Sequence, residues 1–329
     1  MKILFALVAV ITAIVSDGFD IKNDISSKLF EKYSVSCDSY SELHSGDAKF
    51  FGENIITSIG GIFTVISGEG DIRKYPDIHT NWVDCVADEG IVIYANFSKQ
   101  VGMLRFDDEM NLVEHKILME NNHLYIDPAI VKVDHFYYMT FTEIIGNVNN
   151  ANAADANGEY ILHLYKTENF DSLFFVRELA DDVHNIEDVE LFYDGTELHA
   201  VYEYEMVDKS DSAIILQNFD KNGMNKGKKV ELLQPDCDHE PAAMVPFAGG
   251  YQLYYSCDKE EHGASYMGAN AYYAIYNRDF ELVSKDHKIN TKTDKGILFY
   301  DVIQKEEGTN ILYARDYLAD CDLNIETID

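Results

Sequence analysis

The chain has little proline, little tryptophan and little positive charge. Its 329 residues include five prolines and one tryptophan, and 26 Lys and Arg residues stand against 58 Asp and Glu residues. The formal net charge of −32 repels phosphate backbones and anionic lipid surfaces, so nucleic acids and membranes are not expected as partners. No proline-rich or low-complexity linker stands out, so residues 18–329 are expected to form a single domain.

After the first residues the sequence also lacks an apolar run long enough to cross a membrane. The opening "MKILFALVAVITAIVSDG" has a positive residue, an apolar run from Ile3 to Val15 and small residues behind it, a pattern typical of a secretory signal peptide. We therefore expect residues 1–17 to be removed and the mature protein to be secreted, extracellular and monomeric. In that setting the single N-glycosylation sequon, at Asn96, predicts a glycan.

The chain has only five cysteines, so each possible disulfide can be considered separately. In an oxidising compartment some of the five cysteines should form disulfides. Cys237 and Cys257 flank one predicted hairpin, which would bring them side by side, and we predict a disulfide between them. A bridge from Cys37 to Cys321 would tie the two ends of the chain and leave Cys85 unpaired, although the reverse assignment stays open.

Several sequence motifs for cofactors and catalysis are missing. There is no phosphate-binding glycine loop, no dinucleotide fingerprint, no GxSxG elbow and no HExxH zinc motif. The acidic segment "FDDEMN" lacks the spacing of a calcium-binding EF-hand loop. We expect no cofactor and no metal ligand set, with a calcium ion in the central channel of the fold as the alternative.

What the sequence has in quantity is β-hairpins. Alternating aromatic and β-branched residues recur in segments with a Gly or Asp turn in the middle, and helical periodicity is nearly absent. Such units predict an all-β fold, a β-propeller in which each blade is a four-stranded sheet. The first and last hairpins look incomplete, so they belong to one closing blade, giving five blades, or to two, giving six. A β-sandwich is the alternative fold.

Three of these hairpins begin with a carboxylate at the same place. Asp127, Asp188 and Glu240 each precede an apolar strand and have an aromatic residue fourteen positions on. If these strands are the innermost strands of successive blades, the carboxylates converge at one end of the central channel. Clustered carboxylates repel one another, so at least one pKa should be raised, as an acid–base pair for glycosidic cleavage requires.

Aromatic and histidine side chains accompany the carboxylates. We predict that flat aromatic faces near the channel bind sugar rings, and that histidines shortly before the three carboxylates gather at the same mouth. The substrate-binding residues predicted on this basis are Trp82, Tyr138, Tyr202, Tyr251, His123, His184 and His239.

The same segments carry a family resemblance. The strand "IDPAIVKVDHFYYMTFTE" resembles the Asp-Pro strand of five-bladed arabinanase- and xylosidase-type glycoside hydrolases, and "HEPAAMVPFAGGYQLYYS" resembles the strand that holds their general acid. "IEDVELFYDGTELHAVYE" is similar to a strand of the related mannoside phosphorylases, with Val189 and Glu190 in place of Pro-Arg. The resemblance implies that Asp127 is the base, Asp188 tunes the acid and Glu240 is the acid.

Three functions are compatible with this pattern. The first is a secreted carbohydrate-active enzyme that hydrolyses glycosidic bonds in a small-molecule or oligosaccharide substrate. The second is an oxygen-dependent oxidoreductase that acts on a small aromatic substrate, since in length and expected export the chain resembles the secreted luciferases of syllid fireworms. It would use molecular oxygen in the same pocket. The third is a non-catalytic propeller whose carboxylates only bind sugar hydroxyls.

Overall fold

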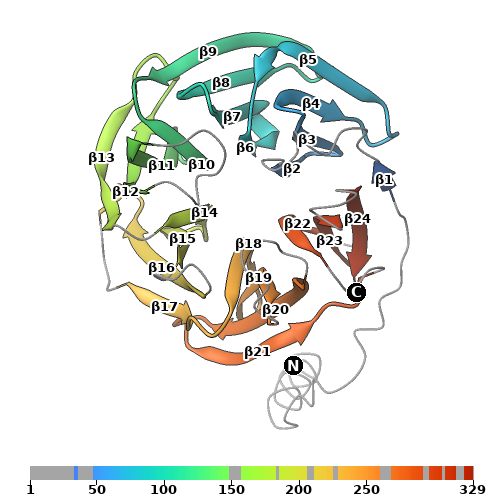
Figure 1. Ribbon diagram of the computed structural model, residues 1–329, viewed down its shortest axis with the longest axis vertical. Coiled ribbons are helices and arrows are strands. Elements are labelled where there is room, and N and C mark those ends of the chain that lie inside the picture. Colours follow the sequence, from blue (N-terminus) through green and yellow to red (C-terminus); the bar gives the residue numbers. More distant parts are fainter. Residues whose placement is uncertain are drawn as a thin grey trace, which may run out of the picture.

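The computed structural model is a ring of six four-stranded antiparallel sheets around a central axis (Figure 1). It describes residues 33–35, 47–147, 157–182, 185–205, 211–224, 229–259, 268–291, 296–305, 308–315 and 322–328. The expected signal peptide, residues 1–17, lies outside the described residues. Each sheet is one blade of a β-propeller, numbered here in chain order.

The first three blades follow one another along the chain. Blade 1 contains β2 (Ala48–Phe51), β3 (Asn54–Ile59), β4 (Ile62–Ile66) and β5 (Ile72–His79). Blade 2 contains β6 (Trp82–Val86), β7 (Ile91–Asn96), β8 (Gln100–Phe106) and β9 (Leu112–Glu120). Blade 3 contains β10 (Leu124–Val133), β11 (Phe136–Asn147), β12 (Asn157–Thr167) and β13 (Phe174–Asp182).

The remaining blades complete the ring. Blade 4 contains β14 (Ile186–Tyr193), β15 (Glu197–Glu205), β16 (Ser212–Asp220) and β17 (Val230–Leu233). Blade 5 contains β18 (Asp238–Phe247), β19 (Gly250–Asp258), β20 (Asn270–Asn277) and β21 (Leu282–Lys288). Blade 6 contains β22 (Leu298–Lys305), β23 (Gly308–Arg315), β24 (Asp322–Ile328) and β1 (Tyr33–Val35).

Blade 6 closes the ring with strands from both ends of the chain. Its outermost strand, β1, pairs with β24, so that Tyr33 lies opposite Ile325 and Val35 opposite Leu323. The incomplete first and last hairpins therefore belong to two different blades, and six is the correct one of the two blade counts. The five-blade count is wrong because β1 supplies the strand that the last hairpin lacks. Six radial sheets also replace the alternative β-sandwich.

The hydrophobic core lies between neighbouring blades rather than inside one sheet. Side chains alternate across a strand, so each sheet has two apolar faces to bury, and each face packs on the next blade. Ile214 and Leu216 of blade 4, for example, share a buried cluster with Met244, Leu253 and Tyr255 of blade 5. This packing fixes the positions of the innermost strands β2, β6, β10, β14, β18 and β22 around the axis (Figure 1).

Helix is nearly absent, as the sequence predicts. In the described part of the chain the only helical element is a single turn of 3-10 helix, η2 (Ala87–Glu89). No helix there is long and apolar enough to span a membrane.

Candidate active site

The innermost strands do not run straight past the axis. The pairing of β10 with β11 shifts between Ile126 and Ala129, and that of β14 with β15 shifts between Glu187 and Glu190. Asp127 and Asp188 lie inside these two β-bulges with φ of 45° and 47°. A bulge re-aims the side chain that it carries, and Asp tolerates the left-handed conformation better than most residues. The two predicted carboxylates therefore take the same unusual backbone conformation in adjacent blades.

A hydrogen bond joins these two bulges. The backbone N–H of Asp188 donates to Asp127 Oδ2 at 3.0 Å. The carboxylate of Asp127, the base implied by the family resemblance, thus connects blade 3 to blade 4.

The same kind of bond recurs around the ring. In each case an aspartate on or beside one innermost strand accepts a backbone N–H from the innermost strand of the next blade. The pairs are Val83 N–H to Asp47 Oδ2 at 3.0 Å, Ile130 N–H to Asp84 Oδ2 at 2.6 Å and Phe50 N–H to Asp301 Oδ2 at 2.8 Å. Asp127 therefore has a structural role that it shares with three other aspartates.

The side chains of Asp188, Glu203 and Glu240 form a carboxylate cluster. One carboxylate oxygen from each of the three residues lies within 4.8 Å of the others. Glu203 and Glu240 are 4% and 6% exposed, whereas Asp188 is half-buried. The structure thus brings Asp127, Asp188 and Glu240 together, as the three repeated hairpins predict.

Glu203 is the member of the cluster that sequence reasoning missed. It lies on β15, the second strand of blade 4, and pairs with Glu187 of β14. The sequence signal was an acidic residue directly after the predicted aromatic Tyr202, in the alternating segment "VYEYE". Nothing in that alternation distinguishes a residue that faces the axis from one that faces solvent.

Burial and mutual repulsion raise the pKa values in this cluster. Burial raises the pKa of Glu240 well above its usual range, and the charges of Glu203 and Asp188 and a hydrogen bond with Asp188 raise it further. Burial, Asp238 and Asp188 have the same effect on the pKa of Glu203. A buried acid that keeps its proton near neutral pH is a competent proton donor.

The flanking carboxyls are affected in the same direction. Burial and then Asp188 raise the pKa of Asp127 well above its usual range, against the lowering effect of the Asp188 N–H. Burial, followed by Glu205 and Asp258, raises the pKa of Asp238 to about 7. Burial and mutual repulsion therefore favour the protonated forms of these carboxyl groups, which titrate as a coupled set.

A second charged cluster also lies at the axis, and it contains a lysine. Lys49 Nζ of β2 lies 3.6 Å from Glu190 Oε2 of β14. Burial alone lowers the pKa of Lys49, but Glu190, Asp301, Asp84 and Asp47 outweigh it and hold the pKa well above its usual value. These residues come from four different blades, so Lys49 neutralises carboxylates from around the ring.

Three of the four predicted sugar-binding aromatics are placed elsewhere. Tyr138, Tyr202 and Tyr251 are 1%, 0% and 7% exposed and pack in the clusters between blades, so the prediction that they present open faces to a sugar is wrong. The Tyr138 hydroxyl donates to the Lys221 carbonyl at 2.9 Å. Trp82 begins β6, is partly buried and packs edge-on against Phe97 at 5.1 Å. Of the four, Trp82 alone retains partial exposure.

The predicted histidines do not form one group. His123 Nδ1 contacts Glu143 Oε1 at 2.6 Å, and Glu143 Oε2 contacts His163 Nε2 at 2.9 Å. The hydrogen bond from His163 lowers the pKa of Glu143 to about 2. His239 is 1% exposed and binds Ser212, and His184 lies outside the described residues.

The structure also tests the covalent predictions. A disulfide joins Cys237 to Cys257, as predicted, and Cys85 is a free thiol. The predicted Cys37–Cys321 bridge lies outside the described residues. Asn96 ends β7, is 2% exposed, and donates from Nδ2 to the His79 carbonyl at 3.0 Å. A glycan on Asn96 would have to replace this hydrogen bond, and it stays a prediction.

Two groups of side chains in the described structure could hold a metal ion. One is the carboxylate cluster of Asp188, Glu203 and Glu240, whose oxygen ligands suit a hard cation such as calcium, so a calcium ion there stays a prediction. The other is Cys237, His239 and Cys257, whose sulfur and nitrogen atoms suit a softer metal, although the two sulfurs form the disulfide.

Comparison with known proteins supports the fold. No protein-family model matches the chain, and no curated protein matches it in sequence. In structure it is similar to a thermostable family-43 glycoside hydrolase, with a TM-score of 0.51 and 14% identity over 75% of this chain and 87% of that chain.

Two further solved structures give the same result. An exo-β-1,3-galactanase from Phanerochaete chrysosporium has a TM-score of 0.51 and 10% identity over 91% of this chain and 64% of that one. A β-1,2-mannobiose phosphorylase from Listeria innocua has a TM-score of 0.50 and 9% identity over 90% of each chain. At these identities the similarity establishes the β-propeller fold.

Proposed function

We propose that this chain is a secreted carbohydrate-active enzyme that hydrolyses glycosidic bonds with the carboxylates at the propeller axis. The observation that carries the proposal is the contact of Glu240 with Asp188 and Glu203 in a buried site that raises the pKa of Glu240. The names of the structural neighbours, a glycoside hydrolase, a galactanase and a mannobiose phosphorylase, agree with this class of substrate.

In this proposal each carboxylate has its own role. Glu240 is the general acid, which donates a proton to the leaving oxygen of the sugar. Asp188 tunes this acid, because its charge and its hydrogen bond favour the protonated form of Glu240. Asp127 is the base, and its raised pKa makes it a stronger proton acceptor once it has ionised.

The leaving group of the substrate tests the role of Glu240. In Glu240→Gln we expect kcat/KM for aryl glycosides with poor leaving groups to fall by about 10²–10⁴-fold, because no proton reaches the departing oxygen. Dinitrophenyl glycosides should retain most of their rate, because dinitrophenolate leaves without a proton. A panel of aryl furanosides and pyranosides measures both effects.

The matched control is Glu114→Gln, the same change on the outer strand β9. It should leave both classes of substrate at wild-type rates. An equal loss of rate for poor and activated leaving groups in Glu240→Gln would overturn the assignment of the acid.

A non-catalytic sugar-binding propeller is the second candidate. The observation that favours it is the bond from Asp188 N–H to Asp127, which repeats a purely structural bond made by Asp47, Asp84 and Asp301. Binding of an oligosaccharide by calorimetry, without release of reducing sugar over a long incubation, would support this candidate. Neither the described structure nor the comparisons support the luciferase alternative.

A further inference from the structure

The imidazole of His239 is held in one orientation and one tautomer. Its Nδ1 lies 2.8 Å from the carbonyl oxygen of Ser212, and a carbonyl can only accept a hydrogen bond. Nδ1 therefore carries a proton, and in the neutral imidazole Nε2 carries a lone pair. The backbone N–H of His239 also donates to Ser212 Oγ at 2.6 Å, so that the residue is fixed by β16 from the neighbouring blade.

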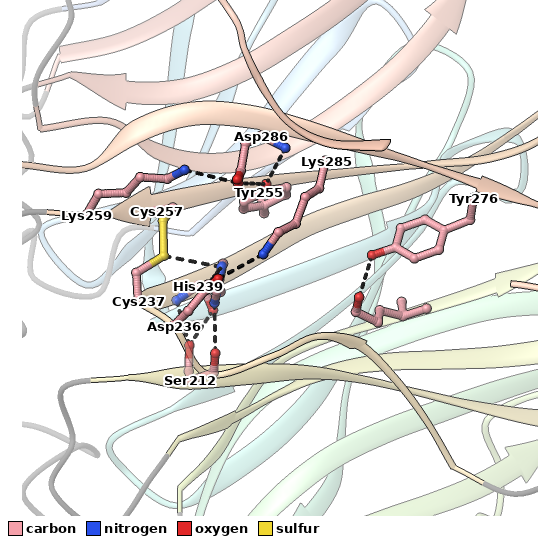
Figure 2. A network of polar contacts seen from close by, with 11 residues as sticks. Ser212, Asp236, Cys237, His239, Tyr255, Cys257, Lys259, Tyr276, Lys285 and Asp286 are labelled. Carbon is pink, nitrogen blue, oxygen red and sulfur yellow. Dashed lines mark hydrogen bonds and ion pairs between the residues drawn. A yellow bond between two sulfur atoms is a disulfide. The ribbon is translucent and has the colours of Figure 1, made fainter. Parts of the chain in front are cut away.

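The lone pair of Nε2 points at atoms that cannot donate to it. Nε2 lies 3.2 Å from Cys237 Sγ and 3.4 Å from Asp236 Oδ1 (Figure 2). In the disulfide the sulfur has no hydrogen, and the carboxylate oxygen is an acceptor. His239, Cys237 and Cys257 are 1%, 2% and 0% exposed, which leaves water little access to the ring nitrogen. Around the neutral imidazole, three electron-pair donors thus converge with no hydrogen between them.

We propose that, once the disulfide is reduced, Cys237, Cys257 and His239 bind a soft divalent metal ion such as Zn²⁺, with Asp236 as the fourth ligand. Two thiolates, one imidazole and one carboxylate form a ligand set that suits tetrahedral Zn²⁺. The site shares no residue with the cluster of Asp188, Glu203 and Glu240, and the inference does not rest on the proposed function.

Three of the four ligands already lie close together, with one ligand atom of Cys237, His239 and Cys257 within 4.8 Å of the others. With Zn–N near 2.0 Å and Zn–S near 2.3 Å, neighbouring ligand atoms lie about 3.3–3.8 Å apart. The contacts of Nε2 with Asp236 Oδ1 at 3.4 Å and with Cys237 Sγ at 3.2 Å are close to that range. The two sulfur atoms must separate, which breaking their bond allows, and the Asp236 carboxylate must move closer to them, because it lies outside the group of three close ligands.

The surroundings resemble those of a metal-bound histidine. Histidines that bind metals usually donate their other ring N–H to a carbonyl or carboxylate, as His239 does to Ser212. Lys285 Nζ lies 2.8 Å from Asp236 Oδ2, so it orients the carboxylate and leaves Oδ1 toward the ring (Figure 2). The Asp236 side chain is 57% exposed, so an ion from solvent would meet this carboxylate first.

The chemistry balances with a dithiol as the reductant. The dithiol transfers two electrons and two protons to the Cys237–Cys257 bond and becomes a cyclic disulfide itself. Binding of Zn²⁺ then replaces the two thiol protons, which are released to solvent. The disulfide and the bound metal are therefore mutually exclusive states of one site.

Cobalt provides the spectroscopic test, because Co²⁺ in a tetrahedral thiolate site has visible bands and a sulfur-to-cobalt charge-transfer band. The full-length protein, reduced with a phosphine and checked for its β-sheet circular dichroism, should bind one Co²⁺ with these bands, and Zn²⁺ should displace it. The oxidised protein should not develop them. We expect Cys257→Ser to weaken binding by about 100-fold or more and Asp236→Asn by about 10-fold.

Cys85 is the internal control, because it is the other thiol in the described structure. Zn²⁺ should protect Cys237 and Cys257 of the reduced protein from alkylation, as mapped by mass spectrometry, and should leave the alkylation of Cys85 unchanged. Cys85→Ser should keep the cobalt spectrum. The proposal is overturned if a folded Cys237→Ser/Cys257→Ser variant binds Co²⁺ as tightly as the reduced wild type, or if the oxidised protein gives the same spectrum.

Discussion

Lys49 and Glu190 form an ion pair across the propeller axis, with Nζ 3.6 Å from Oε2. Their strands, β2 and β14, belong to blades 1 and 4, which lie three positions apart in a ring of six. Asp84 and Asp301 of two further blades add to the field that holds the pKa of Lys49 high. One lysine therefore neutralises carboxylates from blades on all sides of the axis.

Replacing this lysine should destabilise the whole ring. In Lys49→Met, Glu190 and its neighbours lose their cation while staying buried, and we expect the free energy of unfolding to fall by about 3–5 kcal/mol. Urea denaturation followed by tryptophan fluorescence, with Trp82 as the single tryptophan, measures the change. Lys116→Met, which removes an exposed pair with Asp171, should stay near wild type. Equal stability of the two variants would contradict the assigned role of Lys49.

Two substitutions at Asp127 separate its structural role from its proposed catalytic role. Asp127→Asn retains an oxygen that accepts the Asp188 N–H, so the stability should stay close to wild type while glycoside hydrolysis is lost. Asp127→Ala leaves that buried N–H without an acceptor and should lower the free energy of unfolding by about 1–3 kcal/mol as well. Thermal unfolding and hydrolysis rates measured on both variants decide the matter. Full activity in Asp127→Asn would remove Asp127 from the catalytic groups.

The sequence predicts the hairpins well because their chemistry is local. Alternating apolar residues and Gly turns are enough to predict the innermost strands that carry Asp127, Asp188 and Glu240. The Cys237–Cys257 disulfide follows from the same hairpin. Asp127 and Asp188 lie inside their β-bulges, but Glu240 pairs with Ser256, and the bulge of blade 5 follows Pro241. The sequence alignment that equates these three carboxylates is therefore wrong by one residue in blade 5. A bulge adds one residue to a strand, and the hydrophobic pattern of the sequence does not show where that residue is inserted.

Contacts between blades could not be predicted in the same way. Lys49 and Glu190 are far apart in sequence, and Glu203 reaches the axis from a second strand. Their proximity depends on the number of blades and on the register of each sheet. Tyr138 and Tyr202 were misassigned because period-2 alternation gives the two faces of a strand but does not say which of them packs against the next blade.

Gly250 is required at the turn between β18 and β19. Its φ is +154°, and an added Cβ would overlap the carbonyl oxygen of Tyr276. Because backbone must move to relieve this contact, we expect Gly250→Ala to lower the free energy of unfolding by about 2–3 kcal/mol. Gly195→Ala, at the turn of blade 4, has φ +93° with nothing within 4 Å and should cost about 1–2 kcal/mol. Chemical denaturation of both variants measures the two losses of stability. A larger decrease in the free energy of unfolding for Gly195→Ala than for Gly250→Ala would contradict the prediction.

The protein should be more stable at mildly acidic pH than at mildly alkaline pH. Burial raises the pKa values of Asp238 and Asp84 to about 7 and that of Asp47 to about 6. The folded state therefore binds protons that the unfolded state has released above about pH 4, so the free energy of unfolding falls as the pH rises from about 4 to 7. The buried His239 acts in the opposite direction below about pH 6.5, because burial lowers its pKa.

Melting temperatures measured between pH 5 and pH 8 test this expectation. Tm should decrease across the range, because the buried carboxyls that must ionise outnumber His239. Asp238→Asn cannot ionise, so its Tm should fall less steeply over the same range. Glu143 provides the contrast: a hydrogen bond from His163 lowers its pKa to about 2, so its stabilisation is lost only as the pH falls from about 4 through 2. A Tm that rises from pH 5 to pH 8, with the same slope in Asp238→Asn, would show that these carboxyls are already ionised in the folded protein.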